Sequence, residues 1–318
     1  MAIYQYPAQD ELLVSLARCL APGQKRGAVE VIDRLPNVYQ SSSASEVVAC
    51  RVHSGEERRI FCKYGHGEEI SIGHRGGTSR EALVYERVLT PLQLRPCFLG
   101  SHLDPATGNT WLFLEFLGEC LRMQKGRQPH AMKSAAEWIA RFHRINESRI
   151  DTLDFLPRYD LAYYLSWVER TRQFAAPLAR EFRWLEKLCA RAPRLLAVLL
   201  ERPHTIIHAE YFPQNVLLLQ GEGACAVDWE SAAIAPGELD LASMCVGWGT
   251  DLQALAERHY QLIRWDRLQG ACFEEALGAA RLYWAFRWLG EKPEWSVDPD
   301  RRLWYTELRD VGSRFGLI

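Results

Sequence analysis

The stretch that decides the fold reads Ile206-Ile-His208-Ala-Glu210-Tyr-Phe-Pro-Gln-Asn215-Val-Leu-Leu-Leu219, followed after a short turn by Ala226-Val-Asp228-Trp-Glu230. Apolar runs within it predict three short strands, at 204–208, 215–219 and 224–228. Glu210 falls on the loop after the first strand, Asn215 begins the second strand and Asp228 ends the third. Short strands fix such residues in place, so this stretch is the first candidate for a functional site.

The polar residues of this stretch come in a defined order. His208 is followed by the carboxylate of Glu210, the amide of Asn215 and the carboxylate of Asp228. Phosphoryl transfer from ATP uses such groups, because one carboxylate orients and deprotonates the attacking hydroxyl. An amide oxygen and a second carboxylate hold Mg²⁺ on the phosphate oxygens. The order therefore favours an ATP- and Mg²⁺-dependent phosphotransferase.

The same residues resemble a known family, the aminoglycoside phosphotransferase and choline kinase-like proteins, which are related to protein kinases. The family signature is close to His-Gly-Asp-x-x-x-x-Asn followed by a strand that ends in Asp. Here it reads His208-Ala-Glu210-x-x-x-x-Asn215 and then Asp228, and the later run Ala235-Pro-Gly-Glu-Leu-Asp240-Leu-Ala is similar to the family's turn before Asp-Leu-Ala. The resemblance implies that Glu210 is the catalytic base in place of the usual Asp. It also implies that Asn215 and Asp228 bind the metal and that Asp240 supports the catalytic loop.

Outward from this stretch, the N-terminal third is rich in strand patterns and the rest is rich in helical periodicity. Strands are predicted at 29–34, 46–53, 58–64, 96–103 and 110–117, with one helix from Thr78 or Ser79 to about Leu92. Helices are predicted at 131–146, 159–176, 178–201, 251–268, 273–290 and 299–314. Together with the resemblance, this order predicts an α+β, two-lobed, protein-kinase-like fold. Residues 1–117 would form a small antiparallel-sheet N-lobe that ends in a hinge, and residues 118–318 a mainly helical C-lobe with the catalytic loop, the metal site and the substrate-binding helices.

The resemblance places the nucleotide phosphates near one lysine. Lys63 lies late in the 58–64 strand, where a lysine would neutralise the α- and β-phosphates and pair with a glutamate on the following helix. Glu81 is the predicted partner and Glu86 is the alternative. The two are five residues apart and point to different helix faces, so only one should face the nucleotide.

Further nucleotide contacts are predicted from the hinge and from a serine loop. The segment from Trp111 to Gly118 resembles the strand and hinge that bind the adenine edge through backbone groups, which implicates Glu115 and Leu117. The loop at 41–45 contains no glycine, unlike the phosphate loop of protein kinases. Its amides and hydroxyls can still contact phosphate, and we assign that contact to Ser42 and Ser43.

Composition excludes several other classes. Of the 318 residues, 48% are hydrophobic and 25% are charged, as in an ordinary globular protein. Lys+Arg 38 against Asp+Glu 40 gives a net charge of −2, so neither nucleic acid nor an anionic membrane is a predicted partner. The nine cysteines never form Cys-x-x-Cys, and neither a signal peptide nor a membrane-spanning run is apparent. These features favour a cytoplasmic location.

The sequence leaves two questions open. The acceptor is predicted only as a hydroxyl on a small molecule: an aminoglycoside, an amino alcohol or another metabolite. Acidic residues that could hold a polycation are Asp154, Asp160, Glu169 and those within 291–300, and an aromatic box for a quaternary ammonium could use Tyr163, Tyr164, Trp167 and Trp288. Because Glu210 is one methylene longer than Asp, the alternative function is a catalytically weak, nucleotide-binding regulatory protein, a pseudokinase. Protein kinase activity is disfavoured, because the eleven residues between Asp228 and Asp240 leave no room for a long activation segment.

Overall fold

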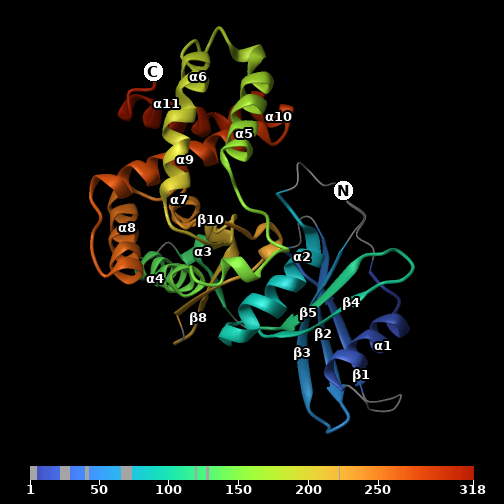
Figure 1. Cartoon of the computed structure of the whole chain (residues 1–318). Helices are drawn as coiled ribbons and strands as arrows, with labels where there is room; N and C mark the ends of the chain where they lie inside the picture. Colours follow the sequence, from blue (N-terminus) through green and yellow to red (C-terminus); the bar gives the residue numbers. More distant parts are fainter. Residues whose placement is uncertain are drawn as a thin grey trace. The chain divides into compact units, whose positions relative to one another are not determined.

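The computed structural model (Figure 1) describes residues 6–21, 29–39, 43–65, 74–118, 120–126, 129–221 and 223–318. The chain forms two compact units. The first unit comprises residues 1–120 together with 227–232, and the second unit comprises residues 121–226 and 233–318. The short segment 227–232, which carries Asp228 and Glu230, is therefore part of the N-terminal unit although it lies far along the sequence.

A five-stranded antiparallel sheet forms the centre of the first unit. The strand order is β1-β2-β3-β5-β4, and every neighbouring pair is antiparallel. The strands are β1 (Val29–Pro36), β2 (Ala44–Val52), β3 (Glu57–Tyr64), β4 (Phe98–Leu103) and β5 (Thr110–Glu115). The predicted α+β class with a small antiparallel N-terminal sheet is confirmed.

The two faces of the sheet differ, because side chains alternate along each strand. On β3, Ile60, Cys62 and Tyr64 belong to a hydrophobic core that also includes Leu12 and Leu16. These two leucines lie on helix α1 (Gln9–Leu20), which the sequence analysis did not predict. Lys63 points to the opposite face from this core, since it stands between Cys62 and Tyr64 in the strand.

The predicted helix from residue 78 to about 92 is present, but its geometry changes along its length. It begins as α2 (Gly77–Val84), continues as a π-helical turn (Tyr85–Leu89) and ends as a 3₁₀ turn (Thr90–Leu92). Pro91 cannot donate a backbone hydrogen bond. The 3₁₀ turn ends at Leu92, and the next residue, Gln93, adopts a left-handed conformation. The regular α-helical part carries Glu81.

The second unit is mainly helical and is built around one long buried helix. Helix α9 (Ala271–Gly290) buries residues on all sides and packs against α5 (Leu161–Phe174), α7 (Glu238–Met244) and α11 (Arg302–Arg314). Figure 1 shows α9 in orange beside these helices. The other helices are α3 (Met123–Gly126), α4 (Pro129–Asn146), α6 (Leu185–Leu196), α8 (Thr250–Trp265) and α10 (Pro293–Val297).

The helix predicted at 178–201 is wrong at both ends. Residues 176–178 form a 3₁₀ turn, and the α-helix α6 begins only at Leu185. Leu178, Ala179 and Glu181 each donate a backbone hydrogen bond to the residue three positions earlier, which is turn geometry. Beyond Leu196 the chain tightens into a 3₁₀ helix (Ala197–Glu201). Apolar periodicity continues through these tighter turns, so it could not locate the ends of the α-helix.

Short strands of the second unit hold residues 206–226. Strand β7 (His204–Ile207) pairs antiparallel with β10 (Ala233–Pro236), which was not predicted. A second small sheet has the order β6-β8-β9 and consists of β6 (Leu121–Arg122), β8 (Val216–Leu219) and β9 (Gly223–Ala226). The loop 208–215 connects β7 to β8 and ends in a 3₁₀ turn (Pro213–Asn215). Within the described residues, no helix is long and apolar enough to cross a bilayer.

Candidate functional site

Lys63 is the centre of a charged cluster in the first unit. Its Nζ lies 2.7 Å from Glu81 Oε2, 2.6 Å from Asp228 Oδ1 and 3.4 Å from Glu230 Oε2. The lysine comes from β3, Glu81 from α2, and the other two carboxylates from the segment after β9. Three parts of the chain that are distant in sequence therefore supply one site.

Backbone interactions fix the carboxylates around Lys63. Asp228 adopts φ 71° and ψ 61°, a left-handed conformation that Asp tolerates better than most residues. Glu81 accepts a hydrogen bond from the amide of Trp229 at 3.3 Å, and the carbonyl of Glu230 accepts one from the amide of Gly76 at 2.8 Å. These bonds attach the 227–232 segment to the start of α2.

The cluster carries more negative than positive charge in a partly dry environment. The side chains of Lys63 and Glu81 are only 10% and 2% exposed, whereas that of Asp228 is 34% exposed. Burial alone would lower the pKa of Lys63, but the three carboxylates outweigh it and raise this pKa well above its usual value. Burial also raises the pKa of Glu81, and the attraction of Lys63 offsets this only in part. The guanidinium of Arg75 lies 3.7 Å from Glu230 Oε1, so two cationic groups face three carboxylates and the cluster keeps an excess of one negative charge.

The donor set suits a magnesium ion. Carboxylate oxygens of Glu81, Asp228 and Glu230 lie within 4.8 Å of one another. Mg²⁺ is a hard cation that prefers oxygen ligands, and it binds through one or two carboxylates together with substrate phosphates. The excess negative charge and the grouped oxygens therefore fit a divalent metal.

The structure distinguishes between the two glutamates that were considered for Lys63. Glu81 contacts the lysine directly, whereas Glu86 lies in the π-helical turn and is exposed. The expected Lys63–Glu81 ion pair is therefore present. Glu230 was not assigned a role, although the Asp228-Trp-Glu230 motif contains it. The sequence feature that could have indicated a role for Glu230 was its position two residues after Asp228, a predicted metal ligand.

The loop 208–215 of the second unit is held by Asp240. Its Oδ2 accepts a hydrogen bond from the amide of His208 at 2.7 Å, and its Oδ1 accepts one from the amide of Ala209 at 2.9 Å. Ala209 adopts φ 60°, a left-handed conformation that costs an alanine about 1–2 kcal/mol. The bonds to Asp240 hold that strained turn in place, which confirms the supporting position expected for this residue.

Glu210 and Asn215 lie together in this loop. The Asn215 side-chain amide donates to the Glu210 carbonyl at 3.0 Å, and the Asn215 backbone amide donates to the Phe212 carbonyl at 2.8 Å. The Glu210 amide donates to His208 Nδ1 at 3.3 Å. The loop backbone is thus fixed around Glu210 from both sides. These residues belong to the second unit, whereas Lys63 and Asp228 belong to the first.

Arg287 of α9 binds the Glu210 carboxylate, a contact the sequence analysis did not predict. Its guanidinium donates to Glu210 Oε1 and lies over the rings of Trp167, Trp284 and Trp288, at 5.9, 5.0 and 5.9 Å from the ring centroids. Two of these tryptophans belong to the aromatic box considered for a quaternary ammonium. Trp167 and Trp288 thus already lie next to a cation of the protein itself, and Tyr164 and Trp167 are fully buried.

The remaining predicted nucleotide residues occupy varied places in the first unit. Glu115 ends β5, and its side chain forms an ion pair with Arg95 and accepts from the Cys97 amide at 3.1 Å. Leu117 follows the strand and is half-buried, and Ser43 is buried immediately before β2. Ser42 lies outside the described residues. The contacts of Glu115 connect β5 to the start of β4, so the side chain has a structural role of its own.

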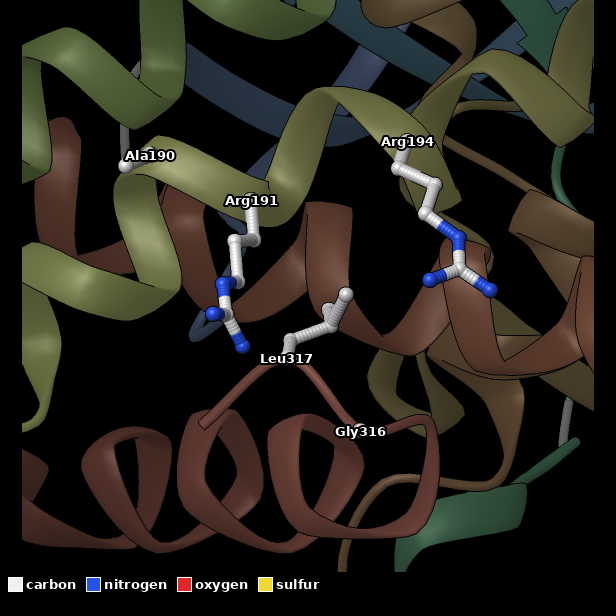
Figure 2. Close-up of a pocket in the computed structure, with 5 residues that line it drawn as sticks. All are labelled: Ala190, Arg191, Arg194, Gly316 and Leu317. Atoms are coloured by element: carbon white, nitrogen blue, oxygen red, sulfur yellow. The ribbon is translucent and has the colours of Figure 1, made fainter.

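A surface hollow elsewhere in the second unit contains none of these residues. It has a volume of about 320 Å³ and is lined by Ala190, Arg191, Arg194, Gly316 and Leu317. Figure 2 shows both arginines extending from α6 beside the C-terminal residues. Arg191 and Arg194 are exposed. The hollow is therefore lined by a different set of residues from the candidate site.

His143 makes the stability of the second unit depend on pH. Its Nε2 lies 3.1 Å from Asp240 Oδ2 and its Nδ1 lies 2.9 Å from the Tyr260 hydroxyl. Burial lowers the pKa of His143 below its ordinary 6.5, and the attraction of Asp240 offsets this only in part. Below pH 6.5 the unfolded chain therefore binds more protons than the folded chain, so stability falls as pH decreases.

We expect a smaller free energy of unfolding in urea at pH 5.5 than at pH 7.5. In His143→Gln, the free energy of unfolding should depend less steeply on pH. An equally steep dependence in that variant would contradict this assignment.

Comparison with known proteins gives the family and supports the fold. Residues 84–288, more than half of the chain, match the phosphotransferase enzyme family. No curated protein has a significantly similar sequence. Among solved structures, an aminoglycoside phosphotransferase from Alicyclobacillus acidocaldarius is 16% identical, with a TM-score of 0.59 over 97% of this chain and 93% of that one.

Two further structures have comparable similarity. The choline kinase LicA from Streptococcus pneumoniae is 13% identical, with a TM-score of 0.59 over 89% of this chain and 94% of that one. The spectinomycin phosphotransferase APH(9)-Ia, in complex with ADP and spectinomycin, is 12% identical, with a TM-score of 0.57 over 98% of this chain and 100% of that one. At these identities the structures support the fold, and the family match supplies the classification. The chain belongs to the phosphotransferase enzyme family.

Proposed function

We propose that this protein transfers the γ-phosphoryl group of ATP to a hydroxyl of a small molecule, in a reaction that requires Mg²⁺. The observation that carries the proposal is the cluster of Lys63 with Glu81, Asp228 and Glu230 in a member of the phosphotransferase enzyme family. A lysine held by one buried glutamate can bind phosphate oxygens. Of the other carboxylates in the cluster, Asp228 provides an oxygen ligand of the kind that a magnesium nucleotide needs.

Residues of the first unit have nucleotide-binding roles in this proposal. Lys63 contacts the α- and β-phosphates, and Glu81 orients the lysine. The backbone of Glu115 and Leu117 contacts the adenine edge, and Ser42 and Ser43 contact phosphate. The proposed ATP-binding lobe is residues 1–117, and the proposed catalytic and acceptor-binding lobe is residues 118–318.

The metal ligands and the base complete the proposal. Asn215 and Asp228 are the proposed ligands of Mg²⁺, which would neutralise charge on the phosphate oxygens when bound. Glu210 orients the acceptor hydroxyl and accepts its proton. The hydroxyl oxygen forms a bond to the γ-phosphorus as the bond between that phosphorus and the bridging oxygen of ADP breaks. Glutamate can replace aspartate in this role, because the two carboxyl groups have similar proton and hydrogen-bonding chemistry.

The contacts of the acidic and aromatic residues that were considered for acceptor binding narrow the range of acceptors. Two of the acidic candidates for binding a polycation already have local partners, since Asp160 caps α5 through the Tyr163 amide and Glu169 pairs with Arg172. Two of the four aromatic candidates, Trp167 and Trp288, lie next to the guanidinium of Arg287. We therefore propose a small hydroxyl compound whose binding does not depend on a quaternary ammonium group in that aromatic box.

A label-transfer experiment tests the function. The protein would be incubated with Mg²⁺, γ-labelled ATP or GTP, and a panel of aminoglycosides, choline, amino alcohols, sugars and macrolides. Transfer of label to one acceptor is expected, with a loss of about 10²-fold or more in Glu210→Gln, since general acid–base catalysis contributes roughly 10²–10⁴-fold. Saturable binding of the magnesium nucleotide without transfer by either protein would contradict the proposed activity. That result would favour the regulatory, pseudokinase alternative.

A further inference from the structure

The contact between Arg287 and Glu210 joins two residues that are 77 positions apart. The Arg287 side chain is 2% exposed and that of Glu210 is 12% exposed. Burial alone would lower the pKa of Arg287, but the attraction of Glu210 outweighs it and raises this pKa above its usual value. The guanidinium therefore stays charged throughout the range in which the protein is folded. A buried charged pair of this kind needs good geometry to be tolerated.

Three tryptophan rings lie next to the guanidinium of Arg287. Trp167 comes from α5, and Trp284 and Trp288 come from the same helix as the arginine. Trp284 is itself fixed by a hydrogen bond from its Nε1 to the Leu239 carbonyl at 2.7 Å. Packing therefore orders the arginine before it binds Glu210, which reduces the entropy lost when the ion pair forms.

The backbone of Glu210 is fixed by its own loop, but the carboxylate stands three bonds beyond the Cα atom. Glutamate has one more rotatable bond than aspartate, so its carboxylate needs additional support to stay in one place. Because Arg287 binds Oε1, it also sets the direction in which Oε2 points. Phosphoryl transfer depends on the positioning of the attacking hydroxyl more than on the strength of the base, so a fixed direction is valuable.

From these contacts we infer that Arg287 is the positioning residue for Glu210 and compensates for the length of the glutamate side chain at the catalytic position. This inference rests on the proposed function, in which Glu210 orients the acceptor hydroxyl. Arg287 acts only through Glu210 in this scheme, so its removal should have no further effect on catalysis once the carboxylate is gone.

A double-mutant cycle tests the inference. ADP formation from Mg-ATP would be measured in the presence of the acceptor panel, so that transfer to any acceptor and to water is counted. Arg287→Met is expected to lower kcat by about 10²-fold, the effect of a displacement of about 1 Å in a positioned group, without a change in KM for Mg-ATP. In a Glu210→Gln background, the same substitution should change kcat by less than about twofold. Arg287→Lys should recover part of the loss, because it keeps the charge but lacks the planar fork.

Arg170 provides the matched control. Its guanidinium also lies over Trp167, at 5.7 Å, and it donates to the Gly290 carbonyl at 2.7 Å. Arg170→Met therefore removes a second arginine from the same aromatic group, and kcat should stay within about twofold of the wild-type value. Thermal unfolding of every variant would show the folded fraction at the assay temperature.

The possible outcomes separate the inference from the proposed function. Losses in Arg287→Met and Glu210→Gln that multiply in the double variant would overturn the positioning role, as would a kcat in Arg287→Met equal to that of the wild type. A fall in kcat that merely follows the loss of folded protein would overturn it too. If wild-type ADP formation does not exceed that of Asp228→Asn, the proposed function itself fails, and this inference fails with it.

Discussion

The Asp228→Asn variant should lose Mg²⁺-dependent ADP formation by on the order of 10³-fold, because removal of one preorganised charged group from an active site commonly costs 10²–10³-fold. Asp228 contacts Lys63 at 2.6 Å and is the most exposed of the three carboxylates in the cluster. The amide that replaces it has nearly the same size but lacks the negative charge. An amide oxygen is a much weaker ligand for a hard cation than a carboxylate.

The same substitution should not destabilise the protein. The three carboxylates of the cluster repel one another, and this repulsion is one reason why the pKa of Glu81 is raised. Removing one negative charge relieves that repulsion, so the melting temperature of the metal-free Asp228→Asn variant should equal or exceed that of the wild type. A gain in stability with a loss of activity is typical of a residue retained for function.

Two measurements check this prediction together: ADP formation over a range of Mg²⁺ concentrations, and the melting temperature without metal. Asp151→Asn serves as the control, since Asp151 is 89% exposed and pairs with surface Arg158 in the second unit. That control should change neither quantity by a measurable amount. Turnover by Asp228→Asn at the wild-type rate would refute the metal-ligand assignment. A large fall in its melting temperature would show that Asp228 has a mainly structural role.

Sequence motifs and the family resemblance were sufficient for part of the candidate site. The resemblance implied that a lysine late in the strand pairs with a glutamate on the following helix, and the predicted strand and helix placed Lys63 and Glu81 on those elements. Asp240 could be identified as a support because it belongs to a short motif. The five strands of the first unit also follow from alternating apolar runs, which tertiary contacts only reinforce.

Long-range packing produced the features that the sequence did not predict. Arg287 lies on helix α9, which carries apolar residues on every face. The periodicity of this helix therefore does not reveal which of its faces contacts the loop 208–215. Helix α1 was missed because its amphipathic pattern is short and precedes the first strand. Strand β10 consists of four residues, and its partner β7 determines it more than its own composition does.

Asp240→Ala is expected to lower the free energy of unfolding of the second unit by about 3–5 kcal/mol, because it leaves several buried donors without an acceptor and each such donor costs about 1–3 kcal/mol. The carboxylate is fully buried and binds the amides of His208 and Ala209 together with the imidazole of His143. Alanine would leave two backbone donors and one ring nitrogen without their acceptor. It would also release the left-handed turn at Ala209, which these bonds hold in place.

The effect of Asp240→Ala on activity should follow from its effect on the loop. At about 2–4 °C for each kcal/mol in a unit of this size, the melting temperature should fall by roughly 10 °C. Asp266→Asn is the matched control, because Asp266 is 73% exposed and asparagine tolerates the left-handed conformation at that position. Stability should therefore change by less than about 0.5 kcal/mol in this control.

Below its melting temperature, Asp240→Ala should still bind Mg-ATP through the first unit, whereas its kcat should fall because Glu210 is no longer held by an ordered loop. Unfolding in urea and calorimetric titration with Mg-ATP measure the two effects separately. Wild-type stability in this variant would show that the buried carboxylate does not support the catalytic loop.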